Sequence, residues 1–338
     1  MGAKAKEQSA QPLSVIGCMT AGFHILNRNL WLIALPVLVD LLLWMGPRLS
    51  VAPLLQGFAA FLRTQRAPDP QTGYQLAQAA ELLLQFGEKF NLLSLLSVLP
   101  LLEVPSLLAQ HAPGALSPLG QPGVFPIRDV LMLLGWALLL IPAGLLLGFL
   151  YLNGLARCVA AAVAHSEPAA AGAQPGIAPV GCIGGLVRIL FFVAVLLGAL
   201  ALFVPLWALL VGMLSAMAQP LGIVVWMLGV GLIAYVALHL LFVVHGVVLG
   251  RRGLLRAIWE SILLFQLQFP SVVWLLLLVV VVYSGLGYAW SLPPGDSWLL
   301  AIGILGNACV ATGLTAATFV FYQERVKYLP QIPQAAKS

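Results

Sequence analysis

The sequence predicts an all-α fold, a polytopic transmembrane helical bundle of about six spans with amphipathic interfacial helices. Of the 338 residues, 61% are apolar (AVILMFWYC) and only 8% carry a charge. The mean hydropathy of the chain is +1.02. In a typical soluble domain about a quarter of the residues are charged, and these residues cover much of the surface. The composition therefore excludes an ordinary soluble enzyme, a disordered chain and a disulfide scaffold.

Runs without Asp, Glu, Lys or Arg locate the spans, because each of these charges at the centre of a membrane helix costs about 3 kcal/mol. Such runs cover residues 130 to 156, 189 to 250, 261 to 295 and 297 to 323. A spanning helix needs about 20 residues, so the second run holds two helices. Its turn signal is the segment 218 to 222, which contains Pro220 and Gly222.

These limits and the flanking prolines and aromatic residues give six expected spans. They cover residues 30 to 46, 131 to 152, 189 to 213, 221 to 249, 271 to 290 and 298 to 322. The first is the shortest, since 17 residues extend about 25 Å, and it needs its flanks or local thinning of the bilayer to cross.

The distribution of basic residues predicts the orientation. With both termini in the cytoplasm, the outer turns near 214 to 220 and 291 to 297 carry no Lys or Arg. We therefore expect a multi-pass protein of a bacterial-type cytoplasmic membrane. The expected segments are a cytoplasmic amphipathic region (1–29), the first span (30–46), an extracytoplasmic amphipathic segment (47–129), a five-span bundle (130–323) and a cytoplasmic tail (324–338).

The segment between the first two spans contains an amphipathic helix and an apolar stretch. Polar residues recur at helical spacing at Gln78, Glu81, Gln85 and Glu88. Residues 90 to 109 are apolar, but Pro100, Glu103 and Pro105 interrupt them. A seventh span here would also reverse the side of the N-terminal basic residues. We expect an amphipathic or re-entrant element on the outer face instead.

Asp40 is the sharpest polar feature, because ionisable groups inside spans are expensive and often functional. One interpretation is a proton or cation site. The other is a carboxylate near the interface that is hydrated, neutralised or caps a neighbouring helix. In the last span Asn307, Thr315 and Thr318 fall near one face. They form either helix-packing contacts or, with Asp40, a solute pathway.

Three further groups of residues are candidates for lipid binding, cofactor binding or helix packing. Arg251, Arg252 and Arg256 lie on an amphipathic helix and are candidate contacts for anionic lipid head groups. His239 and His245 could each hold a haem or pigment, although six residues of helix separate their directions by about 120°. The GxxxG pair Gly144 and Gly148 indicates close packing.

Several classes of site find no support in the sequence. The chain has no P-loop, HExxH or GxSxG motif and no zinc-type cysteine spacing. We expect no catalytic residue, no bound metal and no cofactor. Because the basic residues are scattered, we expect no nucleic-acid partner either. The expected partners are the lipid bilayer, anionic head groups or other membrane subunits.

About a third of the chain, near its two ends, resembles a known type of membrane module. In the first expected span, the segment Leu35-Pro-Val-Leu-Val-Asp40 takes part in this resemblance. The segment Gly253-Leu-Leu-Arg-Ala-Ile-Trp-Glu-Ser261 and the exit Ala316-Ala-Thr-Phe-Val-Phe-Tyr-Gln-Glu-Arg325 carry the similarity. They are similar to bacterial polytopic proteins related to the membrane domain that accompanies glycerophosphodiester phosphodiesterases. The resemblance implies a multi-helix membrane module and no catalytic residues.

These observations favour a non-enzymatic structural, lipid-associated or partner-binding membrane protein. A small-solute or ion transporter that uses Asp40 is the alternative. A pigment- or haem-binding subunit is the second alternative.

Overall fold

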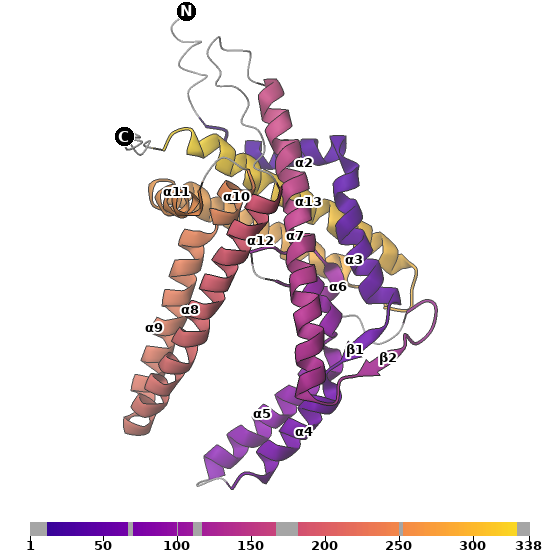
Figure 1. Cartoon of the computed structure of the whole chain (residues 1–338), viewed down its shortest axis with the longest axis vertical. Helices are drawn as coiled ribbons and strands as arrows, with labels where there is room; N and C mark the ends of the chain where they lie inside the picture. Colours follow the sequence, from indigo (N-terminus) through magenta and orange to yellow (C-terminus); the bar gives the residue numbers. More distant parts are fainter. Residues whose placement is uncertain are drawn as a thin grey trace, which may run out of the picture. The chain divides into compact units, whose positions relative to one another are not determined.

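The computed structural model describes residues 12–66, 70–99, 101–110, 117–166, 182–249 and 253–329. These residues are overwhelmingly helical, which confirms the all-α class (Figure 1). Five helices are long and apolar enough to cross a membrane, and a bent pair raises the number to six if it counts as one span. The chain is therefore a membrane protein.

The five long helices match the expected spans and extend them. They are α7 (Val130–Ser166), α8 (Cys182–Met217), α9 (Gln219–Leu240), α12 (Phe269–Trp290) and α13 (Leu299–Val326). As a candidate span, α9 continues through the short helix α10 (Val243–Val248). In α13, 56% of the most apolar stretch is buried, against 11% in α12, so α13 is the most enclosed of these helices.

The expected first span is part of a bent element. Helix α2 (Val15–Arg28) is followed by the 3-10 turn η2 (Leu30–Ile33) and by α3 (Ala34–Met45). The axes on either side of the break differ by 93°. Residues 30 to 46 qualify as a span only together with α2, because α3 has 12 residues and extends about 18 Å by itself.

Two compact units make up the chain. Unit 1 combines the chain up to Ile25, Leu152–Leu277 and the chain from Thr315 onward. Unit 2 combines Leu26–Tyr151 and Leu278–Leu314. Each unit is described by itself below.

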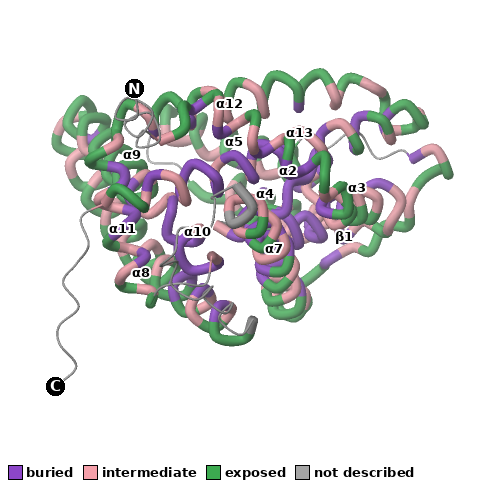
Figure 2. Tube along the Cα trace, turned by 90° about the horizontal axis from the view of Figure 1, so that it is seen from above, coloured by how far each residue is buried: buried purple, intermediate pink, exposed green. Residues whose placement is uncertain are grey.

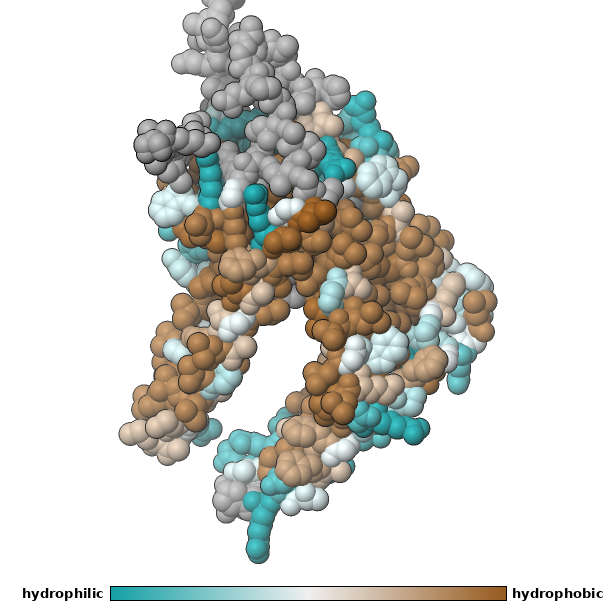
Figure 3. All heavy atoms as spheres, viewed as in Figure 1, coloured by the Kyte–Doolittle hydropathy of each residue, from teal (hydrophilic) through white to brown (hydrophobic). Residues whose placement is uncertain are grey.

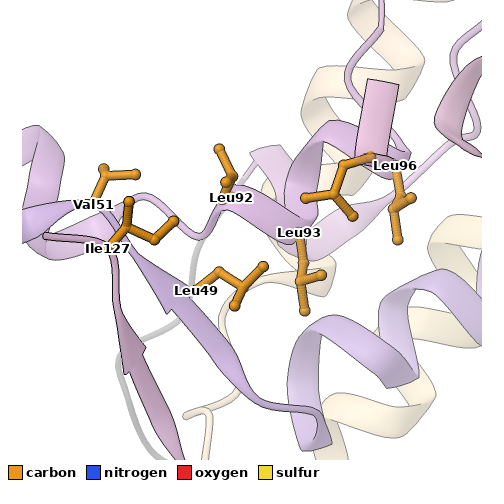
Figure 4. Close-up of a cluster of buried hydrophobic side chains, with 7 residues drawn as sticks. Leu49, Val51, Leu92, Leu93, Leu96 and Ile127 are labelled. Atoms are coloured by element: carbon orange, nitrogen blue, oxygen red, sulfur yellow. The ribbon is translucent and has the colours of Figure 1, made fainter. Parts of the chain in front are cut away.

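Unit 2 contains a two-stranded parallel sheet that the sequence did not predict. Strand β1 (Arg48–Ser50) pairs with β2 (Val124–Pro126), with Leu49 opposite Phe125. The sheet covers a core of Leu49, Val51, Leu92, Leu93, Leu96, Ile127 and Leu140. Figure 4 shows six of these side chains gathered beside the two strands. The core joins the sheet to α7 and to the 3-10 helix η3 (Leu92–Leu96).

Between the strands, α4 (Ala52–Thr64) and α5 (Pro70–Lys89) form a hairpin in which the two helices lie side by side (Figure 1). Small residues make the seam, since Ala59, Ala80 and Gly87 are buried. The Arg48 guanidinium donates to the carbonyl oxygen of Glu88 at 2.9 Å. This contact satisfies the last turn of α5, where a helix dipole favours positive charge.

In unit 1, α8 and α9 form a second hairpin, which turns at Ala218 where the sequence predicted a break. Trp207 Nε1 donates to the carbonyl oxygen of Val225 at 3.0 Å and joins the two helices. The base of the hairpin packs on α10 and on α11 (Leu254–Leu267). Helix α10 is almost wholly buried, as the purple trace in Figure 2 shows.

The continuous helix expected over residues 221 to 249 is broken at Leu241 and Phe242. The break frees backbone groups, which are costly in an apolar environment unless they are satisfied. The Ser261 hydroxyl donates to the carbonyl oxygen of His239 at 2.6 Å and accepts from the Phe242 N–H at 3.1 Å. One side chain of α11 thus bridges the break.

Candidate functional site

Asp40 is the centre of the buried polar structure in unit 2. Its side chain is on α3 and is 0% exposed. The carboxylate accepts three hydrogen bonds, from the Ser106 hydroxyl at 2.5 Å and from the backbone N–H groups of Leu107 and Leu108 at 3.0 and 3.1 Å. This geometry corresponds to one of the arrangements considered from the sequence, a carboxylate that caps a neighbouring helix. The carboxylate accepts from the free N–H groups in the first turn of α6 (Leu107–Gln110).

The segment that Asp40 holds is non-helical at residues 97–99 and 101–106. Ser97, Leu102 and Val104 are buried in it, whereas Val98 and Glu103 are exposed. Asn91 Oδ1 accepts from the N–H groups of Leu49 and Leu93 and fixes its beginning to β1. Ser97 Oγ donates to the carbonyl oxygen of Val104 at 2.6 Å and closes the loop. Irregular backbone is tolerated at membrane depth where protein surrounds it. These hydrogen bonds and the surrounding chain of unit 2 hold the irregular segment in place.

The GxxxG pair on α7 explains how this segment fits. A Cβ at Gly144 would lie 2.6 Å from the carbonyl oxygen of Leu95, and a Cβ at Gly148 would overlap the carbonyl oxygen of Leu102. The absence of side chains at the two glycines therefore lets the backbone of Leu95 and Leu102 lie directly against α7. The sequence predicted close packing for this pair. The packed partners are the end of the 3-10 helix η3 at Gly144 and the irregular segment after it at Gly148.

A second polar group in unit 2 lies at the end of the same segment. The Gln110 amide donates to Glu103 Oε1 at 3.0 Å. The Tyr283 side chain on α12 interacts with Gln110 and electrostatically with Glu103 and Asp40. Desolvation by the surrounding chain raises the pKa of the Glu103 carboxyl, although the residue keeps an exposed surface. The sequence named Glu103 only as an interruption of an apolar run.

The polar residues of the last span are divided between the two units. Asn307, in unit 2, is 2% exposed, and its amide nitrogen has no hydrogen-bond partner within the described residues. One helix turn later, Thr312 accepts a 3.1 Å hydrogen bond from the buried hydroxyl of Tyr151. Thr315 and Thr318 belong to unit 1.

In unit 1, Thr318 contacts His245, one of the two histidines considered above as possible haem ligands. Thr318 Oγ1 donates to the carbonyl oxygen of Thr315 at 2.7 Å and lies 2.9 Å from His245 Nε2. The His245 ring also packs against Phe319, with ring centroids 4.3 Å apart. This geometry is that of a helix-packing contact.

His239 is enclosed in the same way. Its Nδ1 lies 2.8 Å from the carbonyl oxygen of Tyr235, one turn earlier in α9. Tyr235 and Phe265 pack against the ring at centroid distances of 4.1 and 4.5 Å. Across the described ranges, no group of three or more His, Cys, Asp or Glu side chains could hold a metal ion.

A buried carboxylate on α11 was missed by the sequence reasoning, which assigned Glu260 to a surface helix. Glu260 is 5% exposed. It accepts from Arg256 Nε at 3.1 Å and from the Tyr322 hydroxyl at 3.1 Å. Arg256 is thereby tied to a carboxylate one turn away, and 35% of its side chain stays exposed. Arg251 and Arg252, the other candidate head-group contacts, lie outside the described residues.

Arg325 also differs from expectation. The sequence placed it in a cytoplasmic tail, whereas α13 continues to Val326 and leaves Arg325 only 4% exposed. Its guanidinium carbon lies 3.8 Å from the centre of the Phe321 ring, and its Nη1 lies 3.9 Å from Cys18 Sγ. A cation over an aromatic face gains electrostatic energy when water is excluded.

No protein-family model, no curated protein and no solved structure matches this chain.

Proposed function

We propose that the chain is a non-enzymatic membrane module that binds lipid or another membrane subunit through the hairpin of α8 and α9. The observation that supports the proposal is the exposed apolar surface of this hairpin. Only 17% of the most apolar stretch of α8 is buried. The visible face of α8 and α9 is mostly brown in Figure 3, with scattered pale residues along it. Such a surface needs lipid or protein around it.

Three glycines favour a protein subunit as one occupant of this surface. Gly198, Gly212 and Gly231 face open space, with no atom within 4 Å of a Cβ built on them. Small residues on membrane helices let a second helix approach closely. By contrast, Gly222 and Gly229 are already used within the hairpin, against Ser215 and Trp207.

Photo-reactive residues at the exposed positions Leu206 and Met227, with buried Val244 as the control, test the proposal in native membranes. Adducts with lipid or with a discrete membrane protein at 206 and 227 are the expected result, and position 244 should give neither. If cysteines at 206 and 227 instead react with a membrane-impermeant maleimide as fast as exposed loop cysteines, the hairpin is in water and the proposal fails.

A transporter is the second candidate, and one observation favours it. Transporters build their binding sites from non-helical backbone and helix termini between membrane helices, and buried ionisable side chains in such proteins mark ion pathways. Here Asp40 holds residues 106 to 108, and Glu103, Gln110 and Tyr283 lie beside them. Proteoliposomes with wild type and Asp40→Asn, supplied with a broad ion and solute panel, test this candidate. Equal flux at the level of empty vesicles would remove it.

We further propose that both termini face the cytoplasm of a bacterial-type inner membrane. The supporting pattern is the basic residues Arg157 and Arg188 at one end of their helices and the absence of Lys and Arg from residues 291 to 297. Reporter fusions at Arg157 and Pro293 should report opposite compartments, and a shared compartment would contradict the orientation. The relation to the phosphodiesterase-associated membrane domain stays a prediction.

A further inference from the structure

The hairpin of α4 and α5 has two chemically different broad sides. The side on which each residue lies can be calculated from its distance in sequence to a buried seam residue, because each residue turns about 100° around its helix. Measured from Ala80 on α5, Glu81, Gln85 and Glu88 lie at about +80° to +140°, whereas Leu83 and Phe86 lie at about −60° and −120°. Measured from Ala59 on α4, Arg63 and Gln56 lie on the positive side and Phe58 and Phe61 on the negative side.

The two helices run in opposite directions, because Gly87 near the end of α5 packs on Ala52 and Leu55 at the start of α4. In an antiparallel pair, equal rotations from the seam lead to the same broad side. The ion pair between Arg63 and Glu81, at 3.6 Å, spans the positive side and agrees with this geometry. The hairpin therefore has a polar side and an apolar side over residues 54–63 of α4 and 79–88 of α5. The first turns of α5 depart from this division, with Tyr74 on the polar side and Gln75 on the apolar side.

Aromatic rings dominate the apolar side. Phe58, Phe61 and Phe86 are 52%, 56% and 53% exposed. Phe58 stacks on Phe61 at 6.2 Å, and Phe86 stacks on Phe90 at 4.8 Å. Exposed phenylalanines in stacked pairs cost free energy in water, whereas the boundary between head groups and acyl chains accepts them.

The base of the hairpin is attached to the beginning of a candidate span. Leu55 of α4 and Phe90 after α5 pack on the same core as Leu133 and Trp136 of α7. Helix α7 begins at Val130, and its first turns expose Leu131, Leu134 and Leu138. The base of the hairpin is thus packed on the end of a candidate span whose exposed side chains are apolar.

We propose that the α4–α5 hairpin is an interfacial lipid-binding element whose phenylalanine side inserts into one leaflet of a phospholipid bilayer. Attachment at the end of α7 and the division into one charged and one aromatic side fit an element that lies in the plane of the membrane. The proposal depends on the chain's being a membrane protein and not on which occupant covers α8 and α9.

Nitroxide labels on the full chain in phosphatidylethanolamine–phosphatidylglycerol vesicles test the proposal. The four native cysteines are first replaced, and each label is then placed on one side of the hairpin. Ala79→Cys and Ala77→Cys are a matched pair of exposed alanines on the apolar and polar sides of α5, and neither removes an aromatic ring. Phe58→Cys and Gln56→Cys are the matching pair on α4.

We expect collisions with dissolved oxygen to exceed those with a water-soluble nickel chelate at positions 79 and 58, by a ratio several-fold higher than at 77 and 56. Equal and high nickel collision rates at all four positions would show that the hairpin stands in water, and would overturn the proposal. Low rates with both reagents at 79 and 58 would show a protein contact instead, and would overturn it equally. Neither result bears on the occupant of α8 and α9.

Discussion

Ser106 donates a 2.5 Å hydrogen bond to Asp40, which lies 66 residues earlier in the chain. The same carboxylate accepts from the next two backbone N–H groups, so α3 provides the cap for a helix of four residues. The serine hydroxyl in turn accepts from the Ala109 N–H at 3.1 Å. These bonds join the expected first span to the start of α6 and define what Asp40 does in the folded chain.

Replacement of the carboxylate should therefore destabilise unit 2 in a graded order. Asp40→Ala leaves the Leu107 and Leu108 N–H groups without their acceptor, at about 1–3 kcal/mol for each buried group. Asp40→Asn keeps one acceptor oxygen, and Ser106→Ala keeps both backbone bonds to the carboxylate, so each should cost less. Thermal unfolding in detergent should rank Asp40→Ala lowest. An equal loss for Ser106→Ala would show that the backbone bonds contribute little.

Gly148→Ala should destabilise the protein, because the new methyl group overlaps the carbonyl oxygen of Leu102. Overpacking of this kind costs about 1–3 kcal/mol. Gly135→Ala on the same helix is the matched control, since a Cβ there has no atom within 4 Å. Alanine is about 1 kcal/mol better than glycine in a helix, so the control should be neutral or stabilising. Similar unfolding temperatures for the two variants would contradict the packing of residues 95 to 102 on α7.

The helices could be predicted because their signals are local. A run without charges and a turn at Ala218 lie within a few residues of the structure they specify, and α8 and α9 appear where these signals place them. The break at Leu241 could not be predicted, since no Gly or Pro lies there and Ser261, which stabilises it, is 20 residues away. The pairing of β1 with β2 joins three-residue segments that are far apart in sequence.

The polar site was predictable only in part for the same reason. Asp40 stands out because carboxylates are rare in apolar helices. Its partners do not stand out, because serine and backbone N–H groups are common and nothing near residue 106 indicates Asp40. Arg325 and Glu260 were taken for surface charges, since burial of a charge depends on the neighbours that tertiary structure brings. The distant neighbours are Tyr322 for Glu260, 62 residues later in the chain, and Cys18 for Arg325, 307 residues earlier.

Glu103 should make the stability of the protein depend on pH. Its pKa is raised above the ordinary value of 4.5, so the folded state holds the proton more tightly than the unfolded chain. Its contribution to stability is thus lost as the pH rises from the ordinary value through the raised one. Glu103→Gln should unfold at a higher temperature than wild type at about pH 8. This difference in unfolding temperature should vanish at about pH 3, where the carboxyl is protonated in both states.

Gln110→Ala is the control, because it should strengthen the pH dependence of stability that Glu103→Gln removes. The hydrogen bond from the Gln110 side chain to Glu103 lowers the pKa of that carboxyl in part. Gln110→Ala should therefore raise the pKa further and make the loss of stability with rising pH steeper. Parallel melting curves across the pH range for wild type, Glu103→Gln and Gln110→Ala would refute the assignment.

Gly246 and Tyr322 should be energetically coupled. A Cβ at Gly246 would lie 2.6 Å from the Tyr322 hydroxyl oxygen, so Gly246→Ala should destabilise unit 1. Tyr322→Phe should also destabilise it, since the hydroxyl donates to the buried Glu260 carboxylate and bonds to charged groups contribute about 1.5–3 kcal/mol. In the double variant the overlapping oxygen is gone, and the next ring atom lies 3.4 Å from the new methyl group.

The double variant should therefore lose less stability than the sum of the two single losses, by about 1 kcal/mol, within the range of residues in contact. The measurement is a double-mutant cycle on the free energy of unfolding in a mild denaturant. Gly231→Ala combined with Tyr322→Phe is the control cycle, because a Cβ at Gly231 faces open space. It should be additive to within about 0.5 kcal/mol. If the Gly246 cycle is equally additive, the Tyr322 hydroxyl does not lie against Gly246 of α10, and the predicted coupling is refuted.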